Sequence, residues 1–158
     1  MTTTQRHRTS LNGKAILGLL LAVVAAGAFA VASSASSSPR SGELHVTKEC
    51  HEYHGLAGQH CTITSSNIPQ IKVGSKVIYA SAAGDPTPGQ LNSDLIIDGP
   101  GNNTAYGHVV LDLTTGTGVV TFSGGTGEFK HFHAQVAVSP LGGVNFAWDG
   151  TYSFNPPN

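Results

Sequence analysis

The sequence predicts an all-β protein whose fold is an eight-stranded antiparallel closed β-barrel, with a two-sheet β-sandwich as the alternative. Apolar side chains recur at every second position after residue 44, and no window shows the apolar rhythm of an amphipathic helix. Turn residues interrupt the alternation about every 8 to 15 residues, which leaves no room for crossover helices. We therefore expect each strand to pair with the next in antiparallel fashion, and closure to remove the exposed edges of the sheet.

Eight segments carry the alternation in chain order, separated by turns rich in glycine, proline and asparagine. In the last segment, apolar residues from Val144 to Phe154 share one face, and Gly150 continues that face without a side chain. In the segment before it, the apolar face runs from Phe132 to Val138. The expected strands are residues 43–49, 60–66, 75–82, 93–99, 105–116, 118–124, 127–140 and 144–155.

The first 32 residues have the organisation of a secretory signal peptide. Three basic residues, Arg6, Arg8 and Lys14, precede an uncharged run of eighteen residues, 15–32, that ends in small side chains. An uncleaved membrane anchor is the alternative, because this run is at the short edge of a bilayer-spanning length. Residues 33–43 form a predicted flexible serine-rich leader, and residues 44–158 a single β-barrel domain. We predict a secreted or extracytoplasmic protein.

The charge of the predicted mature chain argues against two classes of partner. Cleavage after Ala32 removes three of the eight basic residues and none of the nine acidic ones, which leaves a formal net charge of −4. A mildly acidic domain with scattered cations has no electrostatic footprint for nucleic acid or for an anionic membrane surface. We expect no nucleic-acid partner and no stable membrane anchor after cleavage.

The connection between the first two expected strands contains both cysteines of the chain, Cys50 and Cys61. An even cysteine count in an exported protein favours a disulfide, and closing this loop should stabilise the fold by about 3 kcal/mol. The same connection holds His51, His54 and His60. The first two are one residue too close for the helical zinc motif that needs histidines four apart. A looser metal site and a solvent-exposed loop remain the alternatives, and we predict no metal and no cofactor.

A second histidine pair, His131 and His133, has the spacing that points two side chains the same way from one strand. A metal site there would need a further ligand from a neighbouring strand, such as His108 or Asp112. If Phe132 faces the lumen, both histidines face water, and this is the interpretation we favour.

Aromatic side chains on the apolar faces predict either a filled core or the wall of an apolar pocket. The candidates for the cavity lining are Tyr79, Tyr106, Phe122, Phe132, Phe146, Trp148, Tyr152 and Phe154.

One glycine-rich turn carries a family resemblance. Its matching positions are Gly124, Gly125, Thr126, Gly127 and Phe129. They resemble the G-G-[ST]-G-x-F signature of the allene oxide cyclase and dirigent group of small β-barrels, and residues 148–154 resemble the end of bacterial exported barrels of this type. The resemblance implies a calycin-like eight-stranded barrel, a long strand that begins with the phenylalanine, a largely apolar central cavity, and trimers as among the plant relatives. It implies steering of a reactive lipid or of phenoxy radicals in a pocket, without a compact catalytic motif.

These observations predict an exported barrel that binds or sterically guides a small apolar or aromatic molecule. Whether it is an enzyme stays open, a binding protein without catalysis is the interpretation we favour, and catalytic residues are unknown. One alternative is an isomerase or cyclase acting on an oxygenated unsaturated lipid, which needs a polar group such as Tyr79, Tyr106 or Glu128 in the cavity. Another is a structural or surface-interaction protein, which an exposed apolar patch would indicate.

Overall fold

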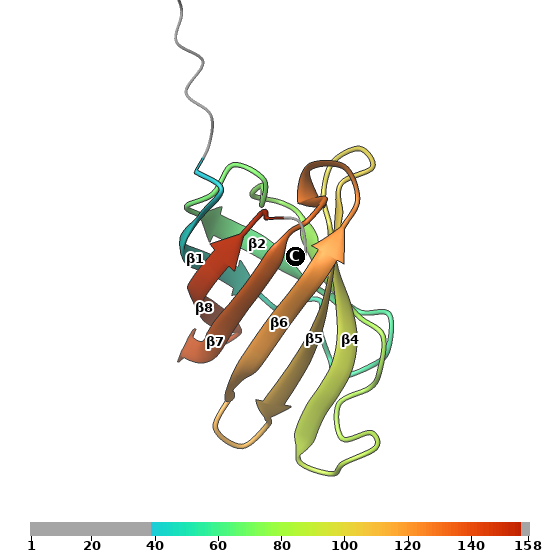
Figure 1. The fold of residues 1–158 in the computed structure, drawn as a ribbon. Coiled ribbons are helices and arrows are strands. Elements are labelled where there is room, and N and C mark those ends of the chain that lie inside the picture. The colour runs from blue at the N-terminus through green and yellow to red at the C-terminus, as the bar shows by residue number, and fades with distance from the viewer. Residues whose placement is uncertain (1–38, 156–158) are drawn as a thin grey trace, which may run out of the picture. The chain divides into compact units, whose positions relative to one another are not determined.

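The computed structural model describes residues 39–155, and the predicted signal peptide and most of the predicted leader lie outside this range. Within it, eight strands form a closed antiparallel barrel in which each strand pairs with the next and the last pairs with the first (Figure 1). The strands are β1 (Ser41–Glu49), β2 (His60–Ser66), β3 (Lys76–Tyr79), β4 (Gln90–Asp98), β5 (Thr104–Asp112), β6 (Thr117–Gly125), β7 (His133–Gly142) and β8 (Asn145–Ser153). The predicted fold class is confirmed. No helix among residues 39–155 is long and apolar enough to cross a membrane.

Each of the eight expected segments overlaps one strand, but most boundaries differ by a few residues, and two of the differences have a clear structural cause. β1 starts at Ser41, inside the expected leader, because its first residues pair with the end of β8 from Ser153 to Thr151. β7 starts at His133 and not at residue 127, because residues Gly127–Phe129 form a 3-10 turn, η1, and His131 has a positive φ of 62°. The expectation of a long strand that begins with the phenylalanine of the turn is therefore wrong.

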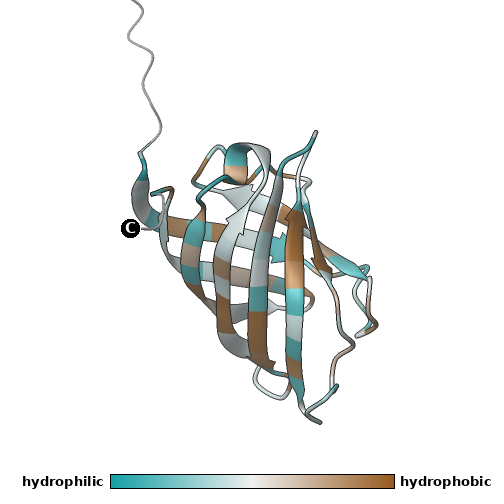
Figure 2. Ribbon diagram, turned by 45° about the vertical axis from the view of Figure 1, so that its right-hand side comes forward, coloured by the Kyte–Doolittle hydropathy of each residue, from teal (hydrophilic) through white to brown (hydrophobic). Residues whose placement is uncertain are grey.

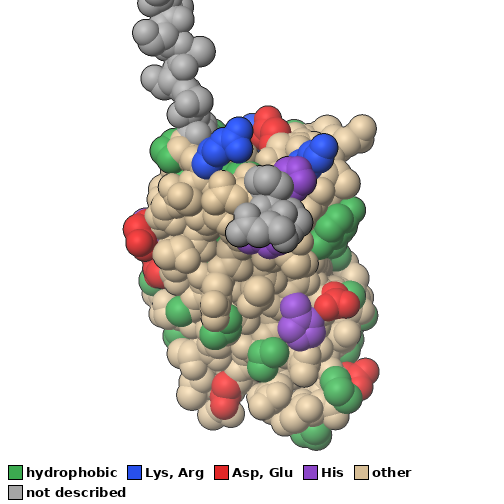
Figure 3. Space-filling model, in the orientation of Figure 1, with side chains coloured by type: hydrophobic (Ala, Val, Ile, Leu, Met, Phe, Trp, Pro, Cys, Tyr) green, Lys and Arg blue, Asp and Glu red, His purple; other side chains and the backbone are tan. Residues whose placement is uncertain are grey.

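The alternation of the sequence becomes the two faces of the barrel wall. Figure 2 shows apolar and polar bands along the strands, and the apolar residues face the interior. One continuous core results, and its largest fully buried side chains are Trp148, Phe122, Phe129, Phe132, Leu44 and Ile63. On the face seen in Figure 3, apolar and charged side chains are scattered among uncharged polar ones.

Gly150 interrupts the apolar face of β8 because two strands approach closely there. It pairs with Val136 on one side and with Leu44 on the other. A Cβ atom at this position would overlap the carbonyl oxygen of Gln135 and crowd the backbone of Val136. The gap in the sequence pattern therefore marks a close approach of the backbone of β7, not space for a ligand.

The glycine-rich turn that carries the family resemblance lies between β6 and β7 and is hydrogen-bonded to the connection between β4 and β5. The hydroxyl of Thr126 donates to the carbonyl of Asn102 at 2.7 Å, and the backbone N–H of Glu128 donates to Oδ1 of Asn103 at 2.9 Å. A Cβ at Gly125 would overlap the carbonyl oxygen of Thr104. The glycines are thus needed for close backbone packing, which positions the fully buried Phe129 under the turn.

The barrel has two ends of different construction. One, which we call the aromatic end, carries residues 67–75, 99–103 and 126–132 and lies at the top of Figure 1. The other, which we call the lysine end, carries residues 50–59, 80–89, 113–116 and 143–144.

Aromatic rings in tilted and edge-on contact fill the aromatic end. Phe132 lies 5.4 Å from Phe122, 5.4 Å from Phe129 and 5.1 Å from Phe154, measured between ring centroids. These separations are typical of favourable aromatic pairs. This part of the lumen is therefore occupied by side chains.

Candidate functional site

Lys48 points into the lysine end of the barrel. It follows Leu44 and Val46 on the inward-facing side of β1, and its side chain is only 4% exposed. A lysine is almost never buried this completely unless it is paired. The position therefore identifies Lys48 as the unusual chemical group of the interior.

The amine of Lys48 is enclosed by aromatic rings and by one hydroxyl group. Its Nζ donates a hydrogen bond to the hydroxyl oxygen of Tyr79 and lies 3.8 Å from Sγ of Cys61. It also lies 4.8 Å from the ring centroid of Trp148, 5.1 Å from that of Tyr79 and 5.7 Å from that of Phe146. Ring faces at these distances stabilise a cation, but less than the full hydration that the burial removes.

Burial lowers the pKa of Lys48 to about 7. The ion pairs among residues 39–155 do not include Lys48, so no carboxylate opposes the desolvation. The titratable groups that face it are tyrosines: burial raises the pKa of Tyr79, with a contribution from neighbouring Tyr53, whose own pKa burial also raises. At neutral pH a large share of Lys48 is therefore an uncharged amine beside a protonated phenol.

A cavity of about 110 Å³ adjoins this amine. Its inner wall includes Lys48, Tyr79 and Leu91, which are buried. Its outer wall includes Phe146, which is half-buried, and Leu113, which is 42% exposed. The cavity thus reaches from the amine toward the surface at the lysine end.

The predicted disulfide between Cys50 and Cys61 is present and forms part of the cavity wall. It joins the residue after β1 to the second residue of β2, so it anchors both ends of the connecting loop. That loop places Tyr53 over the cavity, where its ring lies 4.7 Å from the ring of Tyr79. The disulfide therefore holds one wall of the pocket in place.

Two buried polar atoms near Lys48 lack a protein hydrogen-bond partner within the part of the chain that the structure describes. They are the hydroxyl of Tyr53 and Nε1 of Trp148. Buried polar groups are ordinarily hydrogen-bonded, and each exception calls for an explanation. Because Tyr53 lines the cavity, its hydroxyl is available to a polar atom of a ligand.

The predicted cavity-lining residues divide into three groups. Tyr79 and Phe146 line the cavity at Lys48. The second group packs into the core or against it, and consists of Phe122, Phe132, Trp148, Tyr152 and Phe154. Tyr106 is 47% exposed on the outer face, so its assignment to the lining is wrong. Side chains alternate between the two faces of β5, so Tyr106 lies on the same outer face as the exposed His108, and the buried Val109 lies on the inner face.

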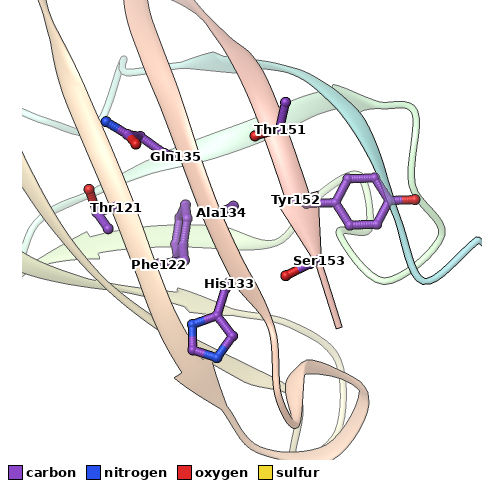
Figure 4. A pocket seen from close by; sticks show the side chains of 8 residues that line it. All are labelled: Thr121, Phe122, His133, Ala134, Gln135, Thr151, Tyr152 and Ser153. Carbon is purple, nitrogen blue, oxygen red and sulfur yellow. The ribbon is translucent and has the colours of Figure 1, made fainter. Parts of the chain in front are cut away.

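A separate hollow of about 340 Å³ lies on the outer face of β6, β7 and β8 (Figure 4). Figure 4 shows that the polar side chains of Thr121, His133, Gln135 and Thr151 surround it. The hollow is larger than the cavity at Lys48, but it is an open surface depression, and the polar side chains around it are exposed or half-buried. We therefore regard the cavity at Lys48 as the stronger candidate.

The histidine clusters of the sequence are dispersed in the structure. No group of three or more metal-ligating side chains converges anywhere in residues 39–155. His51 and His54 are exposed. His131 precedes β7 and borders a hollow with Arg40, whereas His133 borders the hollow of Figure 4, so the two do not project together from one strand.

Three other polar candidates face outward. His108 bonds Asp94 at 2.8 Å on the barrel exterior, and Asp112 is exposed at the end of β5. Glu128 is exposed and pairs with Lys72 at 3.1 Å. Glu128 therefore does not supply the polar group in the cavity that the isomerase alternative requires.

Sequence reasoning missed Lys48 although the signal was present. The residues at positions 44, 46 and 50 share its parity and are buried, so strict alternation already places the lysine inside. The contact of Lys48 with Tyr79 could not be predicted, because Tyr79 reaches the amine from β3. Such a contact depends on the pairing register of separate strands.

Comparisons with protein-family models, with curated proteins and with solved structures find no match to this chain.

Proposed function

We propose that this protein is an exported small-molecule binding barrel whose pocket is the cavity at Lys48. The observation that carries the proposal is a buried amine facing an apolar cavity, in a barrel whose other end is filled with rings. Burying an amine without a carboxylate partner is costly. A fold that retains such a group in a cavity has the arrangement of a binding site, in which apolar walls surround a few placed polar groups.

The pocket chemistry favours a small apolar or aromatic molecule with one polar atom. Aliphatic and aromatic side chains form most of its wall, and the polar contributions are the amine of Lys48 and the hydroxyls of Tyr53 and Tyr79. Its volume of about 110 Å³ is smaller than the roughly 150 Å³ of an engineered cavity that accepts benzene. The ligand therefore enters as a chain or ring edge, and its remainder lies at the mouth between Leu113 and Phe146.

Three features support the exported location and the barrel family as parts of this proposal. The basic, apolar and small-residue order of residues 1–32 is typical of a secretory signal. The disulfide suits an oxidising compartment. The glycine-rich turn resembles that of the allene oxide cyclase and dirigent group, in which an apolar pocket guides the ligand, and a trimer is the assembly that this resemblance favours.

A thermal-shift panel of short alkanes, alkanols, phenols and alkylbenzenes tests the proposal. We expect members that fit the cavity to raise the Tm of the purified protein, and Tyr53→Phe to reduce the shift for hydroxyl-bearing ligands only. A panel without any saturable stabilisation would contradict the proposal.

A second candidate function is an isomerase or cyclase acting on an oxygenated unsaturated lipid. The observation that favours it is the presence of Tyr79 and Lys48 inside the cavity, which are groups able to move a proton. Chiral chromatography of the products of short unsaturated epoxides tests it. We expect the wild type to enrich one enantiomer and Lys48→Met to lose the enrichment, whereas racemic product from both would eliminate this candidate.

A further inference from the structure

We propose that the cavity at the lysine end captures small apolar aldehydes and ketones covalently, as an imine with Nζ of Lys48. This inference rests on the proposed function, because it names the ligand class and the bond formed in the same pocket. It follows from three properties of the site: the surroundings of the amine, the hydroxyl groups beside it, and the shape of the cavity.

The surroundings of Lys48 keep its amine available as a nucleophile. Three aromatic rings, those of Tyr79, Phe146 and Trp148, enclose Nζ, and its hydrogen-bonding neighbours are a phenol and a disulfide sulfur. A lysine activated by desolvation in an apolar pocket is a recognised nucleophile toward carbonyl carbon. The lowered pKa of Lys48, about 7, agrees with this geometry because it leaves much of the amine unprotonated at neutral pH.

The reaction balances without an oxidant or a reductant. The lone pair of the neutral amine attacks the carbonyl carbon, a C–N bond forms, and the π electrons of the C=O bond move to oxygen. A proton moves from nitrogen to that oxygen and gives a carbinolamine. The nitrogen lone pair then expels the oxygen as water, which takes up a proton, and loss of the remaining N–H proton gives the neutral imine. Aldehyde and amine thus become imine and one water molecule.

Two tyrosine hydroxyls are placed to move these protons. The hydroxyl of Tyr79 is already hydrogen-bonded to Nζ, so it can pass a proton to or from the nitrogen. Tyr53 lines the same cavity, and its buried hydroxyl has no protein partner within residues 39–155. It can donate to the carbonyl oxygen and protonate it as it leaves. Burial keeps both phenols protonated at neutral pH, because it raises the pKa of each.

The cavity restricts which carbonyl compounds reach the amine. Its wall includes Leu91, Leu111 and Leu113, and its volume is about 110 Å³. The carbonyl end of a short unbranched chain such as that of hexanal fits this space, and the rest of the chain lies at the mouth between Leu113 and Phe146. A sugar or a keto acid would leave hydroxyl or carboxylate groups against leucine side chains, which is unfavourable.

Reductive trapping with hexanal and cyanoborohydride at pH 7 tests the inference on the intact protein. Peptide mapping should locate an N-hexyl group on Lys48, formed at least about tenfold faster than on exposed Lys76, because only the amine of Lys48 has an apolar cavity beside it that holds the aldehyde. Lys48→Met should abolish the adduct in its peptide. Lys76→Met should leave the rate at Lys48 unchanged. Tyr79→Phe should slow trapping while Lys48 remains the modified residue.

Hexanol, which cannot form an imine, separates the two proposals. Stabilisation by hexanol together with trapping at Lys48 supports both. Stabilisation by hexanol, with trapping at Lys48 no faster than at Lys76, would overturn the covalent inference and leave the binding function standing. If neither hexanol nor other members of the panel stabilises the protein and Lys48 is not trapped, both proposals fail. Circular dichroism of each variant checks that the barrel is intact.

Discussion

The two ends of the barrel are built from the same alternating strands but have opposite interiors. At the aromatic end, Phe122, Phe129 and Phe132 fill the lumen with ring contacts and are fully buried. At the lysine end, the corresponding space holds an amine and a cavity of about 110 Å³. The difference shows that a continuous wall does not determine what the lumen contains. We expect the filled end to supply much of the packing energy that offsets the unfavourable burial of the amine at the other end.

The largest expected effect comes from breaking the aromatic end. Phe132→Ala should lower the free energy of unfolding by about 3 to 5 kcal/mol, because it removes contacts with three rings and leaves a cavity. Urea denaturation measures the loss. The control is Val119→Ala on the exposed face of β6, with an effect of about 0.5 kcal/mol or less. Similar losses for both variants would mean that the aromatic end is not the stabilising half of the barrel.

The disulfide is expected to rank next, and it acts on the lysine end alone. Replacing both Cys50 and Cys61 by serine should cost about 3 kcal/mol, because the unfolded loop regains its freedom. The replacement should also weaken ligand binding more than Phe132→Ala does when both are measured well below their Tm values, since the loop that carries Tyr53 loses its anchor. A thiol assay on the native protein should detect no free thiol. Unchanged ligand binding in the serine variant would show that the anchored loop does not contribute to the site.

Removing the buried amine should stabilise the protein, in contrast to the two preceding changes, which destabilise it. Lys48→Met should raise the free energy of unfolding at pH 7 by about 2 kcal/mol, because the desolvated amine is removed. The gain is partly offset because the hydroxyl of Tyr79 loses its hydrogen-bond partner. Lys76→Met on the outer face is the control, with little effect.

The pH dependence gives this prediction a second readout. The pKa of folded Lys48, about 7, lies below the 10.5 of an unfolded lysine, so the unfolded chain binds more protons between these values. Wild-type stability should therefore rise as the pH rises from about 7 toward 10.5, and this slope should be smaller in Lys48→Met. Equal slopes in both proteins would show that Lys48 stays charged in the fold.

The smallest expected effect lies at the mouth of the lysine end. The backbone N–H groups of Thr115 and Thr114 donate to the carboxylate of Asp112 and lower its pKa. Because the pKa of Asp112 is lower in the folded state than in the unfolded state, its carboxylate stabilises the fold at pH values above the unfolded pKa. This stabilisation is lost as the pH falls through the folded pKa. Asp112→Ala should therefore cost a little stability at pH 7 and progressively less below pH 4. NMR titration of the carboxyl carbon checks the direction, and a pKa above the ordinary aspartate value would contradict it.

The parts of the fold that depend on local pattern could be predicted, and the exceptions have local causes. Eight strands and their order follow from alternation and turn residues, and the disulfide follows from an even cysteine count in a chain with an export signal. The predicted start of β7 is wrong because η1 and the positive φ of His131 interrupt a segment whose sequence alternates between apolar and polar residues. Tyr106 was misassigned because its aromatic character outweighed its outward parity.

The sequence by itself determined the class of fold and the inward position of Lys48, because strand parity is a local property that each segment carries. Only the tertiary structure decided that Tyr53, Tyr79 and Phe146 meet around that amine, since they come from a loop and from two other strands. It also decided which end of the lumen is filled, because packing depends on side-chain volumes summed across all eight strands. The pocket is therefore a product of register and closure, which no single segment encodes.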